Sequence, residues 1–126
     1  MQATALMQTL LQAHYRRYWR LVLVLLLGVV CWFAFKPSMP SVGWAHLDKL
    51  QHIAAFTTLG LVASLGWAPR EGLAGRVGAG LMAYGLFIEA VQTQLPSRSG
   101  SLADWAADAA GIAFGLLLVR LLRRQR

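Results

Sequence analysis

Four apolar segments constrain the fold of this chain more than any other feature of its sequence. They occupy residues 18–35, 50–68, 77–95 and 102–122. A helix needs about 20 apolar residues to cross a hydrocarbon core of about 30 Å, because it rises about 1.5 Å per residue. Lipid offers no hydrogen-bond partners to irregular backbone, so helices are expected. The sequence therefore predicts an all-α fold, an integral membrane four-helix bundle.

Composition supports a membrane protein and argues against nucleic-acid binding. The chain is 57% hydrophobic and 13% charged, whereas a soluble domain averages about 25% charged residues. A net charge of +7 would suggest nucleic acid as a partner of a soluble domain. Here the basic residues cluster at the ends of apolar runs, where they suit membrane topology and anionic headgroups. We expect the lipid bilayer as a partner, no nucleic acid, and an oligomeric state that stays open.

Positive charges predict how the helices are oriented. Three basic residues, Lys36, Lys49 and Arg98, flank one set of helix ends, and nine arginines flank the other set. The nine are Arg16, Arg17, Arg20, Arg70, Arg76, Arg120, Arg123, Arg124 and Arg126. Basic residues favour the cytoplasmic side, which predicts a multi-pass protein of the cytoplasmic membrane with both termini cytoplasmic (N-in/C-in). Residues 1–17 would form a cytoplasmic N-terminal segment, and residues 18–126 the transmembrane domain.

Polar residues gather at the opposite, extracytoplasmic ends of the last three segments. Asp48 and His52 are four residues apart and share a helix face, as do Asp104 and Asp108. Charged side chains at membrane depth usually face a bundle interior or a wet cavity. The sequence therefore predicts a polar pocket between the last three helices. The candidate ligand-binding residues are Asp48, Lys49, His52, Glu89, Gln92, Arg98, Ser101, Asp104 and Asp108.

Structural interpretations compete with this pocket. Asp48 could cap the second helix, and Ser101 with Asp104 matches a capping box at the start of the fourth. Gly111 and Gly115 form G-x-x-x-G, which is typical of a helix-packing face. The polar cluster could also serve only to pin the helices together. Capping does not explain His52, Glu89 and Asp108, which lie deeper in their segments and are the candidate catalytic residues.

The excess of carboxylates over basic groups in the cluster makes a bound cation one possible interpretation. Four carboxylates, those of Asp48, Glu89, Asp104 and Asp108, face few basic groups. Like charges in one site need compensation, which a proton, a divalent cation or a cationic ligand would provide. Histidine with carboxylates suits a hard metal or zinc. No specific motif supports a metal, so the cofactor content stays unknown.

The polar residues also form motifs that resemble those of the VanZ-like family. D-K-x-x-H-x-x-x-F, beginning at Asp48, is similar to the first motif of that family. E-x-x-Q at Glu89, P-x-R-x-x-S at Pro96 and D-x-x-x-D-x-x-G at Asp104 are similar to the second. The resemblance covers about 65 residues of the last three segments. Where Asp108 stands, the family often has asparagine, so an extra acid favours a proton, a cation or an ion pair at this position.

The resemblance implies a role in the cell envelope without implying a reaction. The family is named after a member associated with low-level resistance to the glycopeptide teicoplanin. We expect binding or modulation of an envelope amphiphile, a lipid-linked precursor or a glycopeptide, with Arg98 and Lys49 holding its anionic group. One alternative is an enzyme acting on a lipid headgroup, with His52 as base and Glu89 or Asp108 as acid or metal ligand. The other alternative is a purely structural membrane protein.

Overall fold

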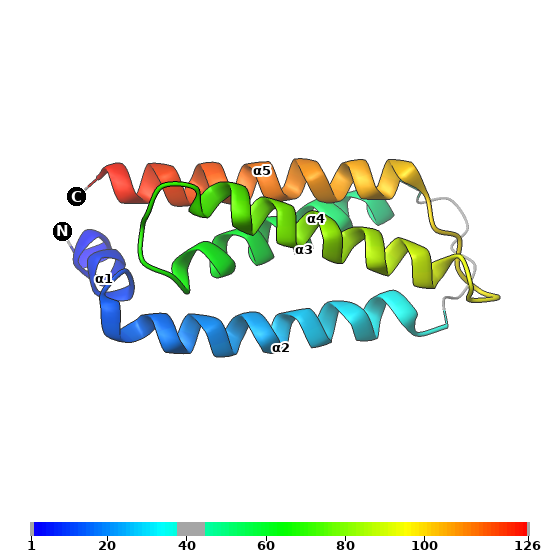
Figure 1. Ribbon diagram of the computed structural model, residues 1–126, viewed down its shortest axis with the longest axis horizontal. Coiled ribbons are helices and arrows are strands. Elements are labelled where there is room, and N and C mark those ends of the chain that lie inside the picture. The colour runs from blue at the N-terminus through cyan, green and yellow to red at the C-terminus, as the bar shows by residue number, and fades with distance from the viewer. Residues whose placement is uncertain (1, 38–44, 126) are drawn as a thin grey trace.

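The computed structural model describes residues 2–37 and 45–125, and the regular secondary structure within these ranges is helical, without strands. Four long helices, α2 to α5, run along the length of the molecule, and a short helix, α1, lies across one end (Figure 1). This confirms the all-α prediction. The elements are α1 (Gln2–Leu10), a 3-10 turn η1 (Ala13–Tyr15), α2 (Arg16–Phe35), α3 (Ala45–Leu65), α4 (Leu73–Gln92) and α5 (Leu102–Arg124).

Local sequence signals explain where several helices begin and end. Helix α2 ends at Phe35, as predicted, because Pro37 forces the preceding Lys36 into an extended conformation (φ −61°, ψ 147°). Gly72 precedes α4 in a left-handed conformation (φ 75°) that suits glycine. Helix α5 begins after Ser101, whose Oγ accepts a hydrogen bond from the Asp104 N–H at 3.0 Å. The capping prediction for Ser101 is therefore confirmed.

Helix α3 begins five residues earlier than the apolar pattern predicts, at Ala45. Asp48 consequently lies inside the first turn of the helix, and the prediction that it caps α3 is wrong. The apolar pattern missed this turn because three of its residues, His46, Asp48 and Lys49, are polar, and the whole stretch from His46 to Lys49 is exposed. A first-turn acid still interacts favourably with the helix dipole.

Within residues 2–37 and 45–125, two helical stretches are long and apolar enough to cross a membrane, Ala13–Phe35 and Leu102–Arg124. Helix α2 has no buried residue. Its side chains include Val24 and Leu25, which are 66% and 68% exposed. Water does not favour an apolar surface of this extent, whereas lipid does. These features indicate a membrane protein.

Glycines bring α3 and α5 into close contact. A Cβ atom on Gly111 would lie 2.5 Å from the Ile53 carbonyl oxygen, and one on Gly115 would overlap the Thr57 carbonyl oxygen. Only glycine at these two positions lets the backbones approach so closely. The predicted packing role of G-x-x-x-G is confirmed, and the contact fixes the register of α5 on α3.

An arginine of α5 forms hydrogen bonds at the C-terminal end of α3. The terminal Nη2 of Arg123 donates to the carbonyl oxygens of Ser64, at 2.8 Å, and Trp67, at 3.5 Å. The last carbonyl groups of a helix have no partner within it. Arg123 therefore caps the C-terminus of α3 from another helix.

Candidate functional site

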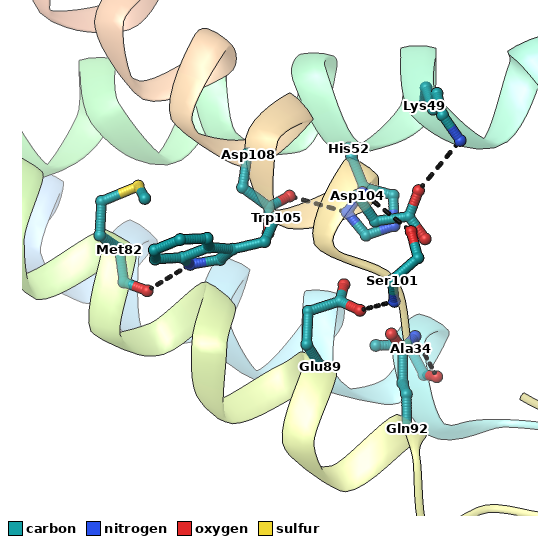
Figure 2. Close-up of polar contacts among 10 residues, drawn as sticks. All are labelled: Ala34, Lys49, His52, Met82, Glu89, Gln92, Ser101, Asp104, Trp105 and Asp108. Carbon is teal, nitrogen blue, oxygen red and sulfur yellow. Dashed lines mark hydrogen bonds and ion pairs between the residues drawn. The ribbon is translucent and has the colours of Figure 1, made fainter. Parts of the chain in front are cut away.

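A buried carboxylate of α5 faces a histidine of α3 at the centre of the polar cluster. Asp108 is 0% exposed, and its Oδ1 lies 2.7 Å from Nδ1 of His52 (Figure 2). The two side chains meet because Ile53 and Gly111, which are close to them in sequence, are in backbone contact. A histidine oriented by a carboxylate is suited to act as a base, as a cation or as a metal ligand.

Glu89 reaches the same cluster from α4. It is 6% exposed, and its Oε2 accepts a hydrogen bond from the Ser101 backbone N–H at 2.7 Å. In Figure 2 its carboxylate points from α4 toward His52. Among the described residues, Glu89 Oε1 and Asp108 Oδ2 are buried without a hydrogen-bond partner. The cluster therefore contains two carboxylate oxygens whose bonding capacity is unused.

Glycines leave room for these carboxylates. A Cβ atom on Gly85 would lie 2.7 Å from Asp108 Oδ2, and one on Gly100 would lie 3.2 Å from Glu89 Oε2. A larger side chain at either position would press on a carboxylate. Trp105 borders the cluster and donates from Nε1 to the Met82 carbonyl oxygen at 3.1 Å (Figure 2). None of these contacts could be recognised from spacing in the sequence.

Asp104 has its own cationic partner. Its Oδ1 lies 3.4 Å from Nζ of Lys49, in an ion pair between α5 and α3. The Asp104 side chain is 8% exposed and the Lys49 side chain is 46% exposed. Lys49 thus reaches from the surface toward a buried acid, which compensates one carboxylate of the cluster.

Gln92 and Arg98 bind the C-terminal end of α2. Gln92 Nε2 donates to the Ala34 carbonyl oxygen at 3.0 Å. The guanidinium of Arg98 donates to the carbonyl oxygens of Phe33, at 2.7 Å, and Lys36, at 3.0 and 3.1 Å. These carbonyl groups have no partner within the helix. Both residues, predicted to bind a ligand, therefore have a structural role that their spacing did not reveal.

A cavity of about 390 Å³ lies beside the cluster, between α2, α3 and α4. The prediction placed the pocket between α3, α4 and α5, where His52, Glu89 and Asp108 come together. This cavity instead adjoins α2, and glycines bring α3 and α5 into close contact. Four predicted site residues line the cavity: Asp48, His52, Gln92 and Arg98. Its apolar walls, which the sequence motifs did not indicate, include Val29, Val30, Phe33, Ala55, Phe56 and Ile88.

In the part of the chain that the structure describes, two sets of residues have donor atoms close enough to hold a metal ion. They are Asp48, His52 and Asp104, and His52, Glu89 and Asp108, with the donor atoms in each set within 4.8 Å of one another. His52 belongs to both sets and also lines the cavity. It therefore connects the open cavity to the buried cluster.

A comparison with known protein families covers the candidate site residues. A family model described as VanZ/LLP1 matches residues 5–123, which include all nine of the candidate residues and the four long helices except the last residue of α5. No curated protein and no solved structure matches the chain significantly.

Proposed function

Because the chain belongs to the VanZ/LLP1 family, we propose that it is a multi-pass protein of the cytoplasmic membrane that binds an envelope amphiphile. In this proposal α2 to α5 each cross the bilayer. Helix α1 and the C-terminal end of α5 lie at one end of the molecule (Figure 1). That end also carries the arginines of residues 16–20, 70–76 and 120–124. The positive-inside rule therefore supports cytoplasmic termini and an extracytoplasmic polar cluster.

The cavity between α2, α3 and α4 is the observation that carries the proposal. Its volume of about 390 Å³ falls within the range of about 300 to 1,000 Å³ typical of small-molecule sites. Apolar walls and a few polar groups match a molecule with a hydrocarbon part and a charged head. Arg98 supplies positive charge and Asp48 negative charge at the polar end. A lipid-linked precursor has such a tail and head, and a glycopeptide with an acyl chain shares this chemistry.

Two neighbouring alanines of α3 allow a matched test. Ala55 lines the cavity, whereas Ala54 is exposed and does not. Native mass spectrometry of the solubilised protein with a polyprenyl phosphate, and separately with teicoplanin, measures the bound ligand. We expect an adduct on wild type and Ala54→Phe that is lost in Ala55→Phe. Equal binding by both variants would exclude this cavity as the binding site. No adduct on the folded wild type would favour a structural role.

The His52–Asp108 contact favours a second candidate, an enzyme acting on a lipid headgroup. Nδ1 of His52 is engaged by Asp108, so Nε2 is left as the ring nitrogen for a substrate in the cavity. A base held in this way can activate water or a hydroxyl group. Mass spectrometry of the protein incubated with a polyprenyl diphosphate tests this candidate. We expect hydrolysis to the monophosphate and free phosphate with wild type and not with His52→Gln. Equal product from His52→Gln, or no product from wild type, argues against this candidate.

A further inference from the structure

We propose that His52, Glu89 and Asp108 form a binding site for one Zn²⁺ ion. The three residues come from α3, α4 and α5, and one donor atom from each lies within 4.8 Å of the other two. The site lies in the buried cluster, behind the cavity wall to which His52 contributes. It does not depend on an amphiphile being bound in that cavity.

The donor set suits zinc. Zinc is bound by histidine nitrogen and carboxylate oxygen at about 2.0 to 2.2 Å, and catalytic zinc sites combine three protein ligands with one open position. Ligand atoms around such a tetrahedral ion stand about 3.4 Å apart. Donors that already lie within 4.8 Å therefore need only small side-chain rotations to reach one ion. The hydrogen bond between His52 and Asp108 would be exchanged for bonds to the metal.

The two buried carboxylate oxygens without a hydrogen-bond partner favour a bound cation. Glu89 and Asp108 are 6% and 0% exposed, and each keeps one buried oxygen without a partner. Burying an unpaired charge costs far more than burying a paired one. Two carboxylates and a neutral histidine together carry a charge of −2, which one Zn²⁺ ion neutralises. Lys49 does not compensate them, since its Nζ is in an ion pair with Asp104.

The second set with metal-ligand spacing is less suitable. It shares His52 but relies on Asp48, which is exposed to solvent. It also relies on Asp104, whose charge Lys49 already compensates. Hydrated and compensated carboxylates gain less from a metal than buried, unpartnered ones. Asp48 therefore provides a control from the same cluster, because its replacement leaves all three proposed ligands in place.

Metal content and affinity test the proposal. Full-length protein in detergent is stripped with a chelator and equilibrated with zinc chloride, and bound zinc is counted by elemental mass spectrometry. We expect one zinc ion per chain in wild type and in Asp48→Asn, and at least tenfold weaker binding by Glu89→Gln and Asp108→Asn. Glutamine at position 89 keeps an oxygen for the Ser101 N–H, so this variant is expected to fold.

Several results would overturn the zinc site. They are a wild type that binds no zinc, undiminished binding by both ligand variants, and a loss in Asp48→Asn equal to theirs. Melting curves give a second readout, since a ligand that binds only the folded state raises the melting temperature. Zinc should raise it in wild type and not in Glu89→Gln. If Glu89→Gln is more stable than wild type with or without zinc, a proton rather than a metal compensates the carboxylates.

X-ray absorption of the wild-type protein tests the ligands without any variant. The proposed site predicts one imidazole and a remaining shell of oxygen around zinc. His14 and His46 are exposed and could bind zinc adventitiously. A spectrum with two or more imidazoles would assign the metal to such surface histidines and contradict the proposal.

Discussion

Replacing Gly111 by alanine should separate α3 from α5 and destabilise the protein. The added Cβ atom would lie 2.5 Å from the Ile53 carbonyl oxygen, whereas ordinary van der Waals contact begins at 3.4 Å. It would also lie 3.0 Å from Phe56 Cβ, on the other side of the same turn. A backbone carbonyl cannot rotate away as a side chain does. The helices must therefore move apart by about 0.9 Å at this point, a distance that forfeits a large part of each dispersion contact.

The expected magnitude combines two opposing effects. Overpacking in a well-packed core costs about 1 to 3 kcal/mol. Alanine is a better helix former than glycine by about 1 kcal/mol, which offsets part of that cost. Gly28, in the middle of α2, has no atom within 4 Å of the position of its Cβ. Gly28→Ala therefore isolates the helix-forming effect, and the two variants should differ in stability by about 1 to 3 kcal/mol.

Thermal unfolding in detergent measures this difference. For a chain of this size each kcal/mol corresponds to about 4 °C in melting temperature, so Gly111→Ala should melt several degrees below Gly28→Ala. The bond between His52 and Asp108 should weaken with it, because these residues adjoin the helix contact. Equal melting temperatures of the two variants would refute the conclusion that the backbone contact between α3 and α5 limits the size of residue 111.

Two further stability predictions concern helix ends. Arg98→Ala should lower stability by about 2 kcal/mol, because hydrogen bonds from a charged donor to the C-terminal carbonyl groups of α2 are lost. Ser101→Ala should cost about 1 kcal/mol through loss of the N-cap of α5, and Ser101→Asp should restore it. Melting curves check both, with Arg70→Ala as control, since the exposed side chain of Arg70 makes no hydrogen bond or ion pair within the described residues. Unchanged melting of either alanine variant contradicts the corresponding cap.

The length and composition of the apolar segments were sufficient to predict the four long helices, but not the first turns of α3 and α4. The four-residue spacing also predicted that His52 shares a helix face with Asp48, and Asp108 with Asp104. The contact between these two side chains could not be predicted, because it depends on the register of α5 against α3. That register is set by backbone contacts at Gly111 and Gly115, which the G-x-x-x-G pattern indicates only as a packing face without naming the partner helix.

The roles of Gln92 and Arg98 were the hardest to predict. Among other polar residues near a membrane surface, both suggest ligand binding. Their hydrogen bonds reach 58 residues from Gln92 and up to 65 residues from Arg98, to carbonyl groups of α2. Backbone acceptors have no signature in a sequence, because every residue carries one. A residue that caps a helix 58 to 65 positions away in the sequence can be recognised only from the three-dimensional arrangement of the helices.

The anchoring of α2 has a consequence for sequence variation. Most hydrogen bonds from other elements to its second half end on carbonyl oxygens, those of Leu27, Phe33 and Ala34 and that of Lys36 directly after it. Cys31 adds a side-chain contact, with Sγ 3.2 Å from the hydroxyl oxygen of Tyr84. A carbonyl group stays in place when its side chain changes, so the anchors on α4 and the following loop hold any apolar helix that ends at the same point. We therefore expect the exposed positions of α2 to accept other apolar residues, because the groups that hold its C-terminal end lie on α4 and in the following loop.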